Sequence, residues 1–358
     1  MTPAYAPPDD DHLIHFFPPM MTMTYYQYAF MLPVSTLVAL CAQICGIGGA
    51  ALFSPIFLLI FPLLGLQLHS PQQAVASALL TEVCGFASGL VGYSCRGLID
   101  WVAARRYVVV SAPSALVGAL LARFVCKNVL ALRLVYSALM IGLGLYLRMS
   151  DHQSASSTDI ATDKASQTKD VESGASVLSK KDGSSSAMKT LVSKNGEYTY
   201  LDVELPNTPS LFAYTVFGSV LTGMLGVGIG EVVLPQLVRR QLMPLPVAAG
   251  TSVCVVVVTA LTAAVVQFIS LAHETLMDGN IDASVQVVPW ELVVWTVPGV
   301  VVGGQLASYV ASKRILKDEQ VVRFASILFL SIGIAFLVKA CLNGDHLAST
   351  TVVEVEAV

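Results

Sequence analysis

One pattern occurs twice in this chain, first as Gly46-Ile-Gly-Gly-Ala-Ala-Leu-Phe-Ser-Pro55 and again as Gly226-Val-Gly-Ile-Gly-Glu-Val-Val-Leu-Pro235. Each copy places a cluster of glycines inside a long apolar run and has proline as its last residue. In a membrane, glycine and proline interrupt a helix and leave backbone groups facing a cavity. Interrupted helices at corresponding places in two halves indicate the substrate site of a transporter.

The composition predicts an integral membrane protein. Of the 358 residues, 55% are hydrophobic and 12% are charged, and the mean hydropathy is +0.70. Soluble domains carry about 25% charged residues. The chain also has several apolar runs long enough to cross a bilayer. Its net charge of -4 offers no basic face for nucleic acid, so we expect a lipid bilayer and no nucleic acid among its partners.

Eight apolar runs are candidate membrane spans, at about 33–63, 74–94, 107–124, 130–149, 211–238, 246–271, 289–311 and 322–342. The first and fifth are the longest, and both contain the glycine–proline motif. We therefore predict an all-α membrane protein with eight transmembrane helices in two homologous four-helix halves, the first helix of each half being interrupted. If each motif is instead a re-entrant hairpin, the two halves have opposite orientations. The sequence leaves both alternatives open.

The order of the segments divides the chain into five parts. Residues 150–208 are rich in serine and lysine and bury too little apolar surface to fold alone, so we expect a mostly disordered linker. The predicted parts are an acidic N-terminal tail over 1–32, a first membrane repeat over 33–149, that linker over 150–208, a second repeat over 209–342 and a C-terminal tail over 343–358.

Three further matches follow the glycine motifs in the same order in both halves. Ala74-Val-Ala-Ser-Ala-Leu resembles Ala248-Ala-Gly-Thr-Ser-Val. Further on, Pro113-Ser-Ala-Leu-Val-Gly-Ala-Leu-Leu-Ala resembles Pro298-Gly-Val-Val-Val-Gly-Gly-Gln-Leu-Ala. Trp101 lies shortly before the third span of the first half, and Trp290 lies at the start of the third span of the second half. Such internal repeats are typical of secondary transporters.

Eight crossings would distribute the basic residues over two sides. One side would hold Arg123, Lys127, Arg133, Arg239, Arg240, Lys313, Arg314, Lys317 and Arg323, and the other Arg96, Arg105, Arg106, Arg148 and Lys339. Short basic loops favour the cytoplasm for the first side, but the linker lysines favour the second. Both orientations stay open.

An anion inside these spans would find almost no buried cation, because the arginines sit near span ends and no histidine lies within a span. Backbone N–H groups at the start of a half-helix, together with hydroxyls, are the remaining donors. The alternative is that the glycines serve close helix packing. The predicted substrate-binding residues are Gly46, Gly48, Gly49, Ser54, Pro55, Ser77, Gly226, Gly228, Gly230, Pro235, Thr251 and Ser252.

Two carboxylates inside apolar runs are candidates for proton coupling. Glu231 follows Gly230 directly, and Glu82 lies in the second span. A carboxylate within a membrane is costly and is a functional candidate by default. Ionised, Glu231 would repel an anion, whereas protonated it would not. The alternatives are that Glu231 faces water or bonds a backbone group freed by the break, or that it and unwound carbonyls bind a cation.

Enzymatic chemistry has little support. The chain has no His-Glu-x-x-His, no Gly-x-Ser-x-Gly and no phosphate-binding loop, so we expect no catalytic residues, no metal and no cofactor. A scaffold or receptor would need a folded domain outside the membrane or a recognisable tail.

The glycine motifs also carry a family resemblance. With the small-residue segments Ala74–Leu80 and Ala248–Val253, and the later helices Pro113–Arg123 and Pro298–Arg314, the chain resembles the TauE/SafE sulfite exporter family. The long serine–lysine linker suggests a eukaryotic member.

The resemblance implies a multi-pass permease, in the plasma membrane or an organelle membrane, that moves sulfite or another sulfur-containing anion such as an organosulfonate by alternating access. Its implied partner is a small anionic solute. A carrier for a cation or neutral metabolite, and a membrane scaffold that transports nothing, are the alternatives.

Overall fold

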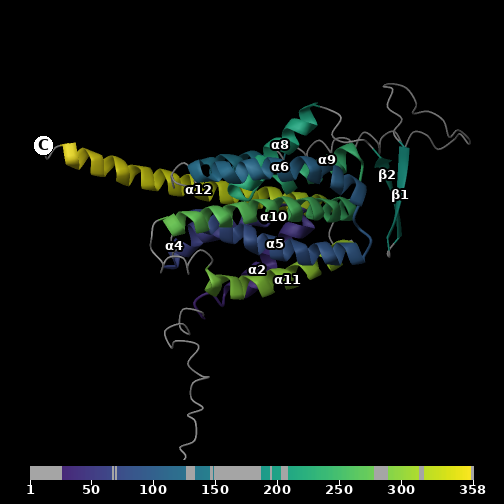
Figure 1. Cartoon of the computed structure of the whole chain (residues 1–358), viewed down its shortest axis with the longest axis horizontal. Coiled ribbons are helices and arrows are strands. Elements are labelled where there is room, and N and C mark those ends of the chain that lie inside the picture. The colour runs from purple at the N-terminus through teal and green to yellow at the C-terminus, as the bar shows by residue number, and fades with distance from the viewer. Residues whose placement is uncertain are drawn as a thin grey trace, which may run out of the picture.

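The computed structural model describes residues 26–66, 68, 71–125, 134–145, 148, 187–193, 196–202, 209–277, 289–313 and 318–355. Most of the predicted N-terminal tail and of the linker lies outside these residues. The described part is a bundle of long helices that lie side by side, with one small sheet at one end (Figure 1).

The helices follow the same order in each half of the chain. The first half contains α2 (Met31–Ile44), α3 (Ala50–Pro55), the π-helix η2 (Ile56–Ile60), α4 (Phe61–Leu63), α5 (Pro71–Cys95), α6 (Trp101–Val125) and a helix at Leu134–Leu145. The second half contains α8 (Pro209–Leu225), α9 (Ile229–Arg240), α10 (Leu245–Met277), α11 (Trp290–Ser312) and α12 (Asp318–Val355). Helix α12 therefore continues beyond residue 342, where the predicted C-terminal tail begins.

Three helices of the described part are long and apolar enough to cross a membrane. They are Gln73–Cys95 in α5, Leu245–His273 in α10 and Trp290–Ser312 in α11. The architecture is thus helical and membrane-embedded, as the composition predicts. Shorter apolar helices account for the remaining candidate spans at Met31–Ile44, Ala50–Leu63, Leu134–Leu145, Leu211–Leu225, Ile229–Val238 and Ser326–Cys341.

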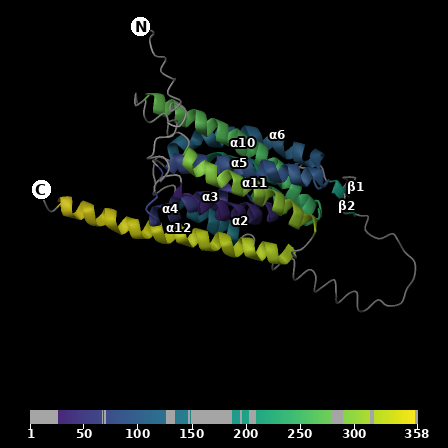
Figure 2. The same cartoon turned by 90° about the horizontal axis from the view of Figure 1, so that it is seen from below.

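The two halves of the chain are interleaved, because helices of the first half pack mainly against helices of the second half. Helix α2 lies along α11, α8 lies along α6, and α5 and α10 lie between these pairs (Figure 1). Helix α12 lies beside α2 along one side of the bundle (Figure 2). Small residues bring these backbones together: Gly303 packs against Thr36 of α2, and Gly223 packs against Ala115 of α6. Glycines outside the two motifs therefore serve helix packing, since the absent side chain permits close approach.

The central helices α5 and α10 run in opposite directions. Near the end of α5, Tyr93 and Leu98 contact Gly250, which lies at the start of α10. At the other end, Ala74 and Ala263 belong to one buried cluster. Helix α5 instead runs parallel to α11, because Gly85 contacts Val300 and Gly92 contacts Ser308.

Both glycine motifs are re-entrant turns. The chain passes along α2, turns at the first glycines and returns through α3, η2 and α4, so that Phe61 packs against Tyr28, with ring centroids 5.8 Å apart. In the second half, a Cβ atom added at Gly228 would lie 2.6 Å from the carbonyl oxygen of Gly218, so α9 folds back along α8. The tertiary structure thereby selects one of the two alternatives that the sequence left open.

Part of the predicted disordered linker is an ordered β-hairpin. Strands β1 (Ala187–Ser193) and β2 (Gly196–Asp202) pair antiparallel, with Ala187 opposite Asp202. Tyr198 and Tyr200 are buried, and the Tyr200 hydroxyl donates to Asp100 Oδ2 over 2.8 Å. For these residues the expectation of disorder is wrong, because two tyrosines supply the apolar surface that the serine–lysine composition lacks.

The predicted division of basic residues between two sides is also wrong. Arg96, at the end of α5, donates to Ser308 Oγ over 2.9 Å, and both Arg96 and Lys313 lie over the ring of Tyr309. Two residues assigned to opposite sides are therefore neighbours. The error follows from counting the second glycine motif as a full crossing, which reverses the side of every loop after it relative to the loops of the first half.

Candidate functional site

The tips of the two re-entrant hairpins meet in the middle of the bundle. At their turns, Gly46 has φ 62° and Gly226 has φ 79°, in the left-handed region that favours glycine. A Cβ atom added at Gly230 would lie 2.9 Å from the Gly48 nitrogen and 3.0 Å from the Gly46 oxygen. The motifs therefore touch through backbone atoms, and only glycine at position 230 allows this approach.

Glu231 joins the two tips through its carboxylate. Its Oε1 accepts a hydrogen bond from the Gly48 N–H of the first tip over 3.2 Å. Its Oε2 accepts one from the Gly228 N–H of its own tip over 3.0 Å. The side chain is buried. The Glu231 carboxylate thus accepts hydrogen bonds from backbone N–H groups that lie just before α3 and α9. Such N–H groups at a helix N-terminus are a common binding site for anions.

Glu82 of α5 lies beside the same glycine. A Cβ atom added at Gly48 would lie 3.1 Å from Glu82 Oε1 and 3.6 Å from Glu231 Oε1. Glu82 is buried, and within the described residues neither of its oxygens has a hydrogen-bond partner.

The predicted hydroxyl ligands separate into two groups. Ser252 reaches the first tip and donates to the Gly46 oxygen over 3.0 Å. Thr251 points away from the tips and accepts from the Asp100 N–H over 3.0 Å, so it holds the turn between α5 and α6. Ser54 and Ser77 are buried on adjoining helices, and neither hydroxyl has a partner in the described part of the chain.

The two prolines are not part of the turns. Pro55 is the last residue of α3 and precedes the π-helix η2, and Pro235 lies inside α9. The glycines alone make the break, and each proline falls in the helix that returns from it. Pro55 lines a separate apolar cavity between α2, the returning segment α3–η2–α4 and α12.

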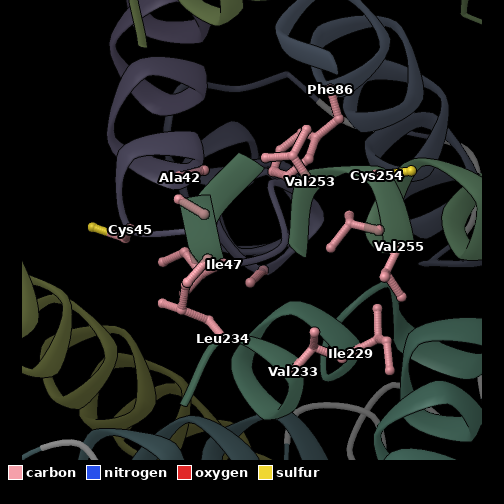
Figure 3. Close-up of a cluster of buried hydrophobic side chains, with 14 of the residues drawn as sticks. Ala42, Cys45, Ile47, Phe86, Ile229, Val233, Leu234, Val253, Cys254 and Val255 are labelled. Atoms are coloured by element: carbon pink, nitrogen blue, oxygen red, sulfur yellow. The ribbon is translucent and has the colours of Figure 1, made fainter. Parts of the chain in front are cut away.

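An apolar shell encloses the meeting point of the tips. Ile47 of the first tip lies beside Leu234 of α9, while Phe86 and Val253 approach from α5 and α10 (Figure 3). These side chains keep water from the backbone groups at the tips. In such a low-dielectric site, hydrogen bonds to a charged group are stronger than in water.

Two tyrosine hydroxyls donate to backbone carbonyls at the ends of α2 and α8, the helices that lead into the two glycine turns. The Tyr93 hydroxyl donates to the Gln43 oxygen over 3.1 Å, and the Tyr136 hydroxyl donates to the Leu225 oxygen over 2.5 Å. Sequence reasoning missed both. The available signal was a tyrosine within an apolar span, because a buried tyrosine hydroxyl almost always has a hydrogen-bond partner.

Residues 31–337 match the sulfite exporter TauE/SafE family. The chain belongs to that family. The match begins at α2 and ends within α12, so it contains both glycine motifs, Glu82 and Glu231. No curated protein and no solved structure matches the chain significantly.

Membership in the TauE/SafE family confirms the resemblance drawn from the glycine motifs. It makes this chain a membrane-embedded permease of a family that handles sulfur-containing anions.

Proposed function

We propose that this TauE/SafE protein is a secondary transporter that binds a small sulfur-containing anion, such as sulfite or an organosulfonate, between the two hairpin tips. The observation that carries the proposal is the position of Glu231, whose carboxylate binds N–H groups of both tips. Donors that hold a carboxylate are suited to an oxyanion of similar charge.

The anion would take the place of the Glu231 carboxylate. Gly48 and Gly228 supply N–H donors that the carboxylate now occupies, and the hydroxyls of Ser54 and Ser77 are available nearby on α3 and α5. Ser252, Gly46, Gly49, Gly226 and Gly230 shape the tips. Thr251, Pro55 and Pro235 support the surrounding helices instead of binding the anion.

A proton would accompany the anion. Two buried carboxylates flank Gly48, and no described residue donates a hydrogen bond to Glu82. Burying an unpaired charge is costly, and a proton is the smallest group that removes the charge. Protonation of Glu231 would weaken the hydrogen bond that its carboxylate accepts from the Gly48 N–H, and this N–H would then be available to the substrate. Glu82 would receive or relay the proton.

The chain path supports an inverted repeat with six crossing helices and two re-entrant hairpins. Helix α2 packs on α11 as α8 packs on α6, and α5 is antiparallel to its counterpart α10. Inverted repeats are a common basis of alternating access, in which one half rocks against the other around a fixed site. The hairpins enter from opposite ends, so each tip would gate one side.

Transport by purified protein in liposomes tests the substrate. We expect uptake of sulfite or of a small organosulfonate to exceed that of sulfate, and we expect sodium to be neither transported nor required. The same samples should melt at a higher temperature with the transported anion, because a ligand of the folded state stabilises it. Sodium flux without anion flux would instead support the cation carrier. Absence of any solute-dependent flux or stabilisation would support the scaffold.

The distribution of charge favours one orientation in the membrane. Among the described residues, the end that carries the β-hairpin holds Arg96, Arg105, Arg106, Arg240, Lys313 and Arg323. Cytoplasmic ends are enriched in lysine and arginine. We therefore propose that the β-hairpin end faces the cytoplasm.

Two exposed cysteines at opposite ends of the bundle test this orientation. Cys95 ends α5 beside the β-hairpin end, and Cys341 lies in the far part of α12. In single-cysteine variants within intact cells, a membrane-impermeant maleimide is expected to label Cys341 directly. It should label Cys95 only after permeabilisation. The reverse pattern would contradict the proposed orientation.

A further inference from the structure

The β-hairpin of the linker contacts the bundle through one face. Tyr198 and Tyr200 of β2 are buried, and Leu191, the partner of Tyr198 across the ladder, packs against the same apolar cluster. Val192, the next residue of β1, is 71% exposed. The hairpin lies at one end of the bundle in both views, beside the turn between α5 and α6 (Figure 1 and Figure 2). Because an isolated two-stranded hairpin is only marginally stable in water, its order depends on this docked face.

Asp100, in the turn between α5 and α6, is the residue that fastens the hairpin to the helices. Its Oδ2 accepts a hydrogen bond from the Tyr200 hydroxyl over 2.8 Å. Its Oδ1 accepts hydrogen bonds from the N–H groups of Val102 and Ala103, over 3.0 Å and 3.3 Å, and so caps the start of α6. One buried carboxylate therefore joins the hairpin to the first turn of α6.

The backbone of Asp100 connects this turn to the second half of the chain. Its N–H donates to Thr251 Oγ1 of α10 over 3.0 Å. The next residue, Ser252, donates from its hydroxyl to the Gly46 oxygen of the first tip over 3.0 Å. Adjacent residues near the start of α10 thus hold the docking point of the hairpin and the tip of the first re-entrant turn.

We propose that the β-hairpin is an autoinhibitory latch: docked on Asp100, it ties the two halves together at this end of the bundle and restrains the first tip. The inference rests on the proposed transport function, because alternating access requires one half to move against the other.

The path of the chain explains how the hairpin restrains the halves. Strand β2 ends at Asp202, shortly before α8 begins at Pro209, so the hairpin is joined covalently to the second half. Its docking residue, Asp100, belongs to the first half. The docked hairpin is therefore a tie between the halves in addition to the packing of the helices, and its release leaves that packing in place. A contact made in only one conformation shifts the population toward that conformation, so release should speed transport.

Hydrogen exchange of the full-length protein, with no anion added, tests the docking apart from transport. Tyr200→Phe keeps the ring but removes the hydroxyl that binds Asp100. We expect the hairpin amides to exchange about tenfold faster, the effect of one hydrogen bond of ordinary net strength. Val192→Thr, at the exposed position of the same hairpin, should exchange as the wild type does. Unchanged hairpin exchange in Tyr200→Phe and in the double variant Tyr198→Ser/Tyr200→Ser would overturn the proposal.

Anion flux in liposomes tests whether the docked hairpin is inhibitory. Tyr200→Phe should raise the initial rate by up to the factor by which hairpin exchange rises, with the wild-type melting temperature. Thr251→Val breaks the connection beyond Asp100, so it should raise the flux while the hairpin amides stay protected. Val192→Thr should transport as the wild type does. A lower flux with a lower melting temperature in Tyr200→Phe would make the hairpin a structural support and overturn its inhibitory role.

The latch and the transport function fail in different ways. If the wild type moves no anion, the transport function is wrong, and the latch is decided by exchange at the first tip, where Tyr200→Phe should accelerate the amides of Gly46 and Ile47. If the wild type moves the anion but Tyr200→Phe changes neither the flux nor the exchange at this tip, the latch is wrong and the transport function stands.

Discussion

Replacing Glu231 with glutamine is expected to remove the pH dependence of anion transport. In the wild type, the ionised carboxylate holds the Gly48 and Gly228 N–H groups, for which the anion would compete under the proposed mechanism. Anion binding should therefore weaken as the pH rises through the titration of Glu231, by up to about tenfold per pH unit, the limit for one proton. Glutamine is neutral at every pH, so Glu231→Gln should bind an organosulfonate, whose own charge is constant near neutral pH, with a flat profile.

Counterflow and gradient-driven uptake distinguish coupling from binding. Glu231→Gln should retain exchange of labelled for unlabelled anion but lose accumulation driven by a proton gradient. Glu82→Gln should also lose accumulation if Glu82 relays the proton. Glu291→Gln, in the first turn of α11, serves as the control and should behave like the wild type. A wild-type pH profile in Glu231→Gln would exclude this residue as the proton carrier.

Replacing Gly230 with alanine is expected to separate the hairpin tips. The added Cβ would lie 2.9 Å from the Gly48 nitrogen and 3.0 Å from the Gly46 oxygen, both of which are backbone atoms. Because backbone cannot rotate away as a side chain can, the tips must move apart. Overpacking of this kind costs about 1–3 kcal/mol. We expect a lower melting temperature and loss of most anion flux.

Gly142→Ala is the matched control for that prediction. Gly142 lies in the helix Leu134–Leu145, and nothing lies within 4 Å of an added Cβ. Alanine there should stabilise the helix by about 0.5–1 kcal/mol, since glycine loses more backbone entropy on folding. Thermal melts and flux measured on both variants decide the matter. If Gly230→Ala melts and transports as Gly142→Ala does, the tips do not depend on close backbone contact.

The sequence was informative wherever one residue type has few roles. Glycine clusters repeated in two apolar runs predicted paired chain breaks, and both are present at Gly46 and Gly226. A glutamate after Gly230 predicted a carboxylate at the second break, and Glu231 lies there. Both predictions rest on the free-energy cost of a single residue in its place. Residues other than glycine adopt a positive φ only at a cost, and a charged side chain within a membrane span is costly as well.

Other features depended on contacts between distant segments. Glu82 was only a glutamate in an apolar run until α5 placed it beside Gly48. Thr251 and Ser252 are neighbours in sequence, yet only Ser252 reaches a tip because successive helical residues point about 100° apart. The β-hairpin was missed because its order comes from Tyr200 docking on Asp100.

By itself the sequence determined that this chain is a helical membrane protein with a glycine-rich chain break at each of two places. Apolar length, charge scarcity and glycine spacing carry that information locally. Only the tertiary structure decided that each break is a turn back rather than a crossing, that the two tips meet, and that Glu82 and Glu231 flank Gly48. The reason is physical: a flexible glycine turn allows either direction, and the packing of the whole bundle selects one.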